Sequence, residues 1–190
     1  MEAIFHFVFE LLKIAILSSA YAIILVSILS FLNKRMSNEF LTKILNSKFK
    51  TWVVFGFLIS VSLFTYMFSY WGNHGLGDYA RIPVGYGKEV SEINGTQAYI
   101  ESNEYNYGSL PVKNFSKQKH FIIGETDSSP VDIPPPYFFW NLKNNKLILF
   151  SSEIEFRHYL LEFGLSNYEL KSFRENYKKY WLGWRFWLLP

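Results

Sequence analysis

Two uncharged apolar runs dominate the N-terminal part of the chain: IAILSSAYAIILVSILSFL at residues 14–32 and TWVVFGFLISVSLFTYMFSYW at residues 51–71. At a rise of about 1.5 Å per residue, helices of these lengths extend roughly 28 and 31 Å, close to the hydrocarbon thickness of a bilayer. The sequence therefore predicts a membrane region over residues 1–71, with two transmembrane helices joined by a loop at residues 33–50.

Two other interpretations of these runs fit the residues less well. A core helix of a soluble protein seldom requires so many consecutive apolar residues, and here two such runs follow each other closely. A cleaved signal peptide would begin with a basic segment, but Glu2 occupies that place. The apolar run also continues well beyond Ala20-Tyr21-Ala22, which resembles a cleavage motif.

The basic residues between the runs predict the orientation of the chain. The loop carries Lys34, Arg35, Lys43, Lys48 and Lys50 against a single acid, Glu39, whereas positive and negative residues balance from Gly72 onward. Cytoplasmic loops of membrane proteins are enriched in Lys and Arg. We therefore expect a cytoplasmic loop, with both termini on the opposite side. The abundance of Phe, Tyr, Ile, Asn and Lys is typical of an AT-rich bacterial gene, so the expected location is the bacterial cytoplasmic (inner) membrane.

A Gly-rich segment follows the second run. Residues 72–87 contain five glycines, which predict an irregular connector. His74, Asp78 and Arg81 are the only residues here whose chemistry suits a catalytic cluster, but polar residues are equally ordinary in a solvated tether. The chain has no cysteine, which excludes disulfides, thiolate nucleophiles and zinc sites of the cysteine type.

Residues 88–190 predict a small α+β domain outside the cytoplasm. Its clearest signal is a β-hairpin, GKEVSEI and TQAYIES joined by Asn94-Gly95, a dipeptide that tolerates the positive φ angles of a type I′ turn. PYFFWNLK and KLILF flank Asn144-Asn145 as a second hairpin, and Phe121 to Gly124 predicts a further strand. Residues 102–118 show no periodicity and are expected to form a loop.

Two helices are expected to close the chain. Ser152 with Glu155, and Ser166 with Glu169, both fit the capping box that starts a helix. Gly164 suits the residue after the first helix. The expected fold is thus a two-helix transmembrane hairpin plus a small α+β domain of antiparallel hairpins and two C-terminal helices. Residues 151–190 carry nearly balanced charges, which argues against a helix-turn-helix that binds nucleic acid.

Small residues inside the runs predict close helix packing. Gly56 and Ser60 lie one turn apart, and such pairs let helix backbones approach each other or a partner helix. At the start of the first helix, His6, Glu10 and Lys13 share one face. They form either an ion or proton relay or a polar turn at the membrane surface, and their position near the helix end favours the second interpretation.

The final segment, WLGWRFWLLP, carries Trp181, Trp184 and Trp187 close to basic residues. This composition is typical of a helix at the boundary between membrane and water. Packing of the Trp side chains in the domain core, or against a partner subunit, is equally consistent with the sequence.

No pattern in the sequence indicates catalysis. The four histidines are scattered, and no HExxH, GxSxG, Walker or EF-hand motif occurs. We expect no cofactor and no metal. The expected function is that of a non-catalytic accessory or scaffold subunit of a bacterial envelope complex, with the bilayer and other membrane subunits as partners and no nucleic acid. The alternative is a membrane-anchored immunity or sensor protein that binds an exported toxin or ligand.

Overall fold

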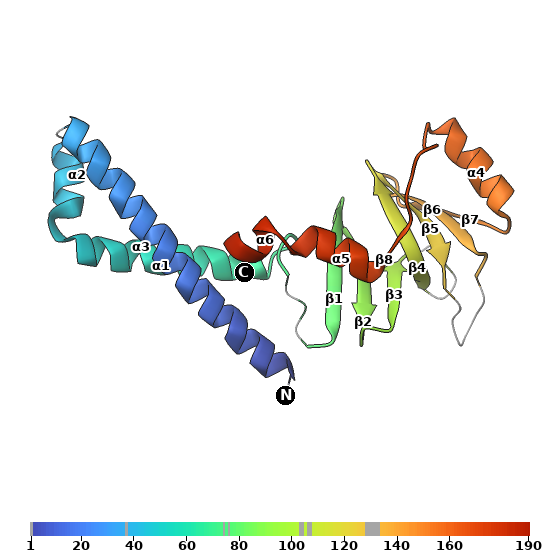
Figure 1. Ribbon diagram of the computed structural model, residues 1–190, viewed down its shortest axis with the longest axis horizontal. Helices are drawn as coiled ribbons and strands as arrows, with labels where there is room; N and C mark the ends of the chain where they lie inside the picture. The colour runs from blue at the N-terminus through green and yellow to red at the C-terminus, as the bar shows by residue number, and fades with distance from the viewer. Residues whose placement is uncertain are drawn as a thin grey trace. The chain divides into compact units, whose positions relative to one another are not determined.

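The structure is a computed structural model that describes residues 2–36, 38–73, 75, 77–102, 105, 108–127 and 134–190. The chain divides into two compact units. The helical unit comprises Met1–Gly77 and Gly183–Pro190, and the sheet domain comprises Asp78–Leu182 (Figure 1). The sheet domain therefore begins before the predicted boundary at residue 88, and the last residues of the chain group with the helices.

The helical unit contains α1 (Glu2–Met36), α2 (Glu39–Ile44), the 3₁₀ turn η1 (Leu45–Ser47) and α3 (Lys48–Met67). Two of its helical stretches, Ala3–Met36 and Glu39–Met67, are long and apolar enough to cross a membrane. Both expected helices are thus present.

The ends of these helices differ from the predicted runs. Helix α1 extends past residues 14–32 in both directions, because no Gly or Pro interrupts it and the basic residues Lys34 and Arg35 suit its C-terminal dipole. Helix α3 stops at Met67, before the end of its apolar run. There the Ser69 hydroxyl donates a hydrogen bond to the Tyr66 carbonyl at 2.7 Å, and the Gly72 amide bonds to the Ser69 carbonyl, so the chain turns.

Helices α1 and α3 pack along a stripe of side chains spaced four residues apart. On α1 the buried members are Glu10, Ile14, Ser18, Ala22 and Val26. A Cβ added to Gly56 of α3 would lie 3.8 Å from the Ala22 Cβ, so the two backbones approach closely at this point. The Trp52 indole of α3 donates a hydrogen bond to the Ser19 carbonyl of α1 at 3.3 Å.

The sheet domain is an antiparallel meander in the order β1-β2-β3-β4-β5-β6-β7, with the short β8 paired to β4 (Figure 1). The predicted hairpin turn is confirmed, since Asn94 and Gly95 have φ of 57° and 62°. The hairpin at Asn144-Asn145 and the strand at Phe121 are also confirmed. The strands are β1 (Tyr79–Gly85), β2 (Lys88–Ile93), β3 (Gln97–Glu101), β4 (Ser109–Gln118), β5 (Phe121–Thr126), β6 (Tyr137–Asn141), β7 (Lys146–Phe150) and β8 (Lys171–Ser172).

Strand β4 corrects the prediction of a loop over residues 102–118. It is the longest strand of the sheet, but its register shifts between Val112 and Asn114, which breaks the alternation of buried and exposed residues. Its first half pairs with β3 and its second half with β8. The periodicity that reveals a strand is therefore lost where β4 changes partner. Strand β1 corrects a second prediction. It occupies Tyr79–Gly85, within residues 72–87, which were predicted to form an irregular connector.

The sheet curls so that β5 and β6 are covered on both faces. Ile122 and Phe138 belong to a larger apolar core with residues of β1 to β4, whereas the adjacent Ile123 and Phe139 belong to a smaller core beneath α4 (Glu153–Glu162). The Lys88 amine of β2 donates a hydrogen bond to the side chain of Asn145, in the β6–β7 turn. The first hairpin therefore curls back toward the far end of the sheet.

The first C-terminal helix matches its predicted start, and the second does not. The Ser152 hydroxyl accepts a hydrogen bond from the Glu155 amide at the start of α4, and Gly164 has a φ of 67° after its end. No helix begins at Ser166. Instead α5 (Phe173–Trp181) begins after Ser172, whose side chain forms the capping box with Glu175.

The segment before α5 stays extended because it packs against the sheet. Leu165, Tyr168 and Leu170 contact the smaller core, and Lys171 and Ser172 pair with β4. These contacts outweigh the capping signal at Ser166, and the second Ser-x-x-Glu sequence caps the helix instead.

The predicted second helix is broken at Gly183, which has a φ of 86° and precedes the short helix α6 (Trp184–Leu188). Within the helical unit, α6 packs on α1. The Tyr21 hydroxyl donates a hydrogen bond to the Leu188 carbonyl at 2.6 Å, and the Lys13 amine lies 4.8 Å from the centre of the Phe186 ring.

Replacement of the two competing caps distinguishes the observed helix start from the predicted one. We expect Ser172→Ala to lower the free energy of unfolding of the sheet domain by about 1 kcal/mol, because the Glu175 amide loses its acceptor. The matched variant Ser166→Ala removes an exposed hydroxyl and should change the free energy of unfolding by less than about 0.5 kcal/mol. Urea unfolding of the full chain in nonionic detergent, followed by tryptophan fluorescence, measures both. A larger loss for Ser166→Ala would contradict the assigned start of α5.

Candidate functional site

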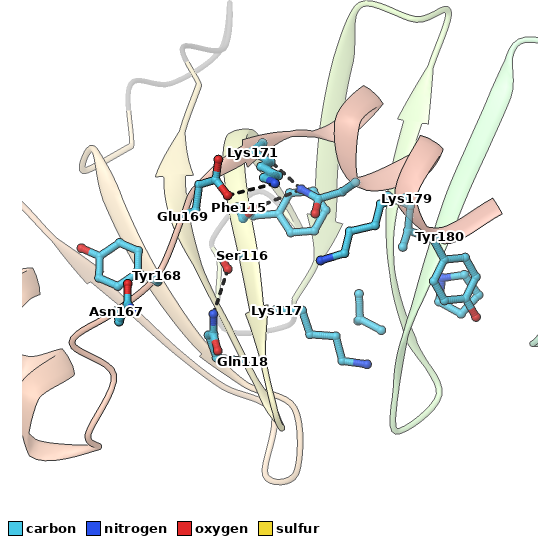
Figure 2. Close-up of a pocket in the computed structure, with 14 residues that line it drawn as sticks. Phe115, Ser116, Lys117, Gln118, Asn167, Tyr168, Glu169, Lys171, Lys179 and Tyr180 are labelled. Carbon is cyan, nitrogen blue, oxygen red and sulfur yellow. Dashed lines mark hydrogen bonds and ion pairs between the residues drawn. The ribbon is translucent and has the colours of Figure 1, made fainter. Parts of the chain in front are cut away.

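A cavity of about 520 Å³ lies in the sheet domain between β1, the second half of β4 and α5. These strands are not paired with each other there, since β1 is the edge of the meander and β4 beyond Phe115 has no partner on that side. Figure 2 shows α5 and the segment before it passing across this gap. The cavity is therefore the place where the curled sheet remains open.

The lining of the cavity carries more positive than negative charge. The positively charged residues of the lining are Lys117, Lys171 and Lys179, and the negatively charged residue is Glu169. Lys171 and Glu169 form an ion pair with 2.9 Å between Nζ and Oε2, so each compensates the other. In the part of the chain that the structure describes, no carboxylate pairs with Lys117 or Lys179.

Lys117 and Lys179 reach the cavity from different elements. Lys117 is on β4 and Lys179 on α5, and Figure 2 shows both side chains extending into the space between these elements. Ser116 and Gln118 also line the cavity, and the Ser116 hydroxyl accepts a hydrogen bond from the Gln118 amide at 3.2 Å. Partial burial lowers the pKa of the Lys117 amine, because desolvation disfavours its charged form.

Asn176 holds the wall of the cavity together. Its side-chain amide donates hydrogen bonds to the carbonyls of Phe115, Lys171 and Ser172, each at 3.1 Å. One amide therefore joins β4, β8 and the first turn of α5. This contact fixes the helix that carries Lys179 relative to the strand that carries Lys117.

His6, Glu10 and Lys13 lie beside one another at the start of α1, on one face of the helix. The His6 Nε2 lies 3.7 Å from one carboxylate oxygen of Glu10, and the Lys13 Nζ lies 4.0 Å from the other. Glu10 is only 6 % exposed, on the face of α1 that packs within the helical unit. Phe186 of α6 covers Lys13, so this cluster is partly enclosed by the C-terminal segment.

The expected interaction residues occupy three different environments. Gly56 and Ser60 are half-buried on α3. Trp181 is buried in the sheet domain, where its indole donates a hydrogen bond to the Arg81 carbonyl at 2.7 Å. Trp184 and Trp187 of α6 are 62 % and 72 % exposed in the helical unit. The three Trp residues therefore do not form one surface.

The suspected catalytic cluster is not assembled among the described residues. His74 lies outside them, and Arg81 forms an ion pair with Glu89 of β2, with 3.0 Å between Nη1 and Oε2. Glu89 also accepts a hydrogen bond from the Tyr79 hydroxyl at 2.7 Å, and burial raises the pKa of Tyr79 to about 12. This network joins β1 to β2 and leaves Tyr79 as a proton donor at neutral pH.

Comparisons of the chain with protein-family models, with curated proteins and with solved structures find no match. Within the described residues, no group of three or more His, Asp or Glu could hold a metal ion. The chemistry of the cavity therefore follows from the residues that line it.

The sequence contains no local signal for this cavity. Lys117 lies in the stretch expected to be a loop, and Lys179 lies in the second predicted helix, where its charge fits a membrane-surface helix equally well. Only the pairing of β8 with β4 brings α5 beside β4. Because that pairing involves two residues, no periodic pattern reveals it.

The role of Asn176 in shaping the cavity is open to direct measurement. We expect Asn176→Ala to destabilise the sheet domain by about 1–3 kcal/mol, because the carbonyls of Phe115, Lys171 and Ser172 lose the side-chain donor that they share. Asn167→Ala alters an exposed residue of the same cavity and should change stability by less than about 0.5 kcal/mol. Urea unfolding in detergent compares the two. Equal stability of both variants would show that Asn176 does not join these elements.

Proposed function

We propose that this protein is a membrane-anchored accessory subunit without catalytic activity of its own. In this proposal the helical unit crosses the bacterial cytoplasmic membrane twice, and the sheet domain docks partner proteins outside the cytoplasm. The observation that carries the proposal is the distribution of side chains on the helical unit, which buries small and polar residues and exposes large apolar ones.

The outer surface of α1 and α3 would be unfavourable in water. Phe5, Ile16 and Phe57 are 78 %, 70 % and 68 % exposed, and many other large apolar side chains of both helices are exposed with them. Burial of one such side chain stabilises a protein by about 1.5–3 kcal/mol, so a surface made of them requires an apolar surrounding. Lipid chains or partner helices supply it.

The hydroxyl groups on this outer surface also suit a lipid environment. Ser27, Ser62 and Thr65 are exposed, and each donates a hydrogen bond to the carbonyl four residues earlier, at 2.8–2.9 Å. In a bilayer no water is available to satisfy polar groups, so internal hydrogen bonds lower the cost of placing a hydroxyl there.

The orientation follows from the charge of the connection between the helices. Lys34, Arg35 and Lys43 are exposed there, which favours a cytoplasmic location. The sheet domain follows the end of α3 that is remote from this connection, and α6 returns to α1 near Lys13 and Tyr21. The exposed Trp184 and Trp187 would then lie at the outer membrane surface, where Trp is favoured.

The sheet domain offers a surface for docking. On α4, Ile154 and Leu161 are 83 % and 61 % exposed on the side opposite the buried Phe156 and Leu160. Exposed apolar side chains on a helix, beside the charged Arg157, are the composition of a protein interface. In contrast, Arg81, which had suited a catalytic cluster, is paired with Glu89.

Reporter fusions test the membrane insertion and its orientation. Alkaline phosphatase folds only after export, so a fusion after Pro190 should be active, whereas a matched fusion truncated after Asn46 should be inactive. The reverse pattern would reverse the orientation. Two inactive fusions recovered in the soluble fraction would contradict membrane insertion.

Extraction of the native protein in mild detergent tests the subunit role. We expect an assembly in which a second membrane protein accompanies the 22.4 kDa chain in constant ratio, measured by native mass spectrometry. The double variant Ile154→Ser, Leu161→Ser should weaken this assembly at unchanged thermal stability, whereas Glu162→Gln on the same helix should leave it intact. Recovery of the wild-type chain only as a monomer would contradict the proposal.

A membrane-anchored sensor or immunity protein is the second candidate, and the lysine-lined cavity favours it. A protein of this class would hold an exported ligand in the sheet domain and would be isolated without a constant partner. The same native mass spectrum separates the two candidates.

A further inference from the structure

The open end of the curled sheet combines features of a ligand site. On one side of β4, the cavity has an apolar floor of Ile82, Val84 and Phe115, each no more than 4 % exposed. Lys117 and Lys179 stand above this floor from two separate elements. A volume of about 520 Å³ lies within the usual size of small-molecule sites, roughly 300–1,000 Å³.

In the described part of the chain, Lys117 and Lys179 are not compensated by an ion pair. Neither has a carboxylate partner among the described residues, although the third lysine of the cavity does. The Lys117 ammonium group also lies near the end of β1, where a Cβ on Gly85 would be 3.9 Å from its Nζ. Two cations that enter one cavity from separate elements, neither paired with a carboxylate among the described residues, can receive an anion from outside.

We propose that this cavity binds a phosphate group, held between the ammonium groups of Lys117 and Lys179. Lysine is a compact point charge that commonly binds phosphate, and the charged residues of this cavity that lack an ion-pair partner among the described residues are both lysines. The ligand is a small phosphomonoester, whose two negative charges at neutral pH balance the two cations. Its phosphate is either that of a free molecule in solution or that of a lipid headgroup, and the experiments below distinguish the two.

This inference is independent of the subunit role. It concerns the sheet domain alone, and its cavity would serve an accessory subunit as well as a sensor. Loss of phosphate binding would leave the membrane topology and the partner assembly unchanged.

Calorimetry with the full chain in nonionic detergent tests the site. Glycerol 3-phosphate should bind with one-to-one stoichiometry and displace inorganic phosphate. Lys117→Gln and Lys179→Gln should each weaken binding about tenfold or more, since each removes one charged hydrogen bond. Lys143→Gln, at an exposed residue in the β6–β7 turn, should bind as the wild type.

The source of the phosphate is distinguished by a second measurement. Native mass spectrometry of the same protein with added phosphatidic acid or phosphatidylcholine shows whether a phosphomonoester lipid binds in preference to a phosphodiester lipid. Saturable binding of phosphatidic acid that depends on Lys117 and Lys179 identifies a headgroup site, and binding of glycerol 3-phosphate alone identifies a soluble ligand.

Three results would overturn the proposal. The first is the absence of saturable binding of glycerol 3-phosphate and phosphatidic acid at millimolar concentration. The second is an equal loss of binding in Lys143→Gln, which would show that only the general charge of the domain attracts phosphate. The third is equally tight binding of citrate, which would show that the cavity does not select phosphate. Thermal unfolding of each variant provides the folding control. Removal of an uncompensated charge should not lower the unfolding temperature.

Discussion

The close approach of α1 and α3 is the constraint on which the helical unit depends. Ala22 and Gly56 meet at the point of close approach, where a Cβ on Gly56 would just contact the Ala22 methyl group, and Trp52 adds a hydrogen bond between the helices. Small residues occupy this part of the seam, and Ile14, Leu63 and Met67 form a small apolar core of the helical unit, while many other large apolar residues of both helices are exposed. The small residues therefore determine how closely the two helices pack.

In the sheet domain a comparable constraint acts at β4. This strand exchanges its neighbour at the irregularity near Lys113, and the exchange lets the sheet curl around its larger core. The curl buries both faces of β5 and β6 but leaves the end of β4 unpaired on one side. The cavity is thus a direct consequence of how the sheet closes. Helix α5 spans it because Asn176 bonds to the Phe115 carbonyl of β4 and Trp181 bonds to the Arg81 carbonyl of β1.

The parts of the fold that depend on local chemistry could be predicted from the sequence. The Asn94-Gly95 turn, the cap at Ser152 and the two apolar helices each follow from residues close together in the chain. The start of α5 could not, because two equivalent capping signals occur and tertiary packing selects the second. Strand β4 was hidden for a related reason, since its alternation breaks where it changes partner. The cavity follows from these two features, so it too required the three-dimensional arrangement.

The contact of α6 with α1 joins the two ends of the chain. Tyr21 and Leu188 are 167 residues apart in sequence, and everything between them, including the whole sheet domain, is synthesised before their hydrogen bond can form. At about 5–20 residues per second, a ribosome needs roughly 8–33 seconds to make this stretch. During that interval Lys13 and the carboxylate of Glu10 lack their C-terminal cover. The first helix must therefore persist long before its last neighbour exists.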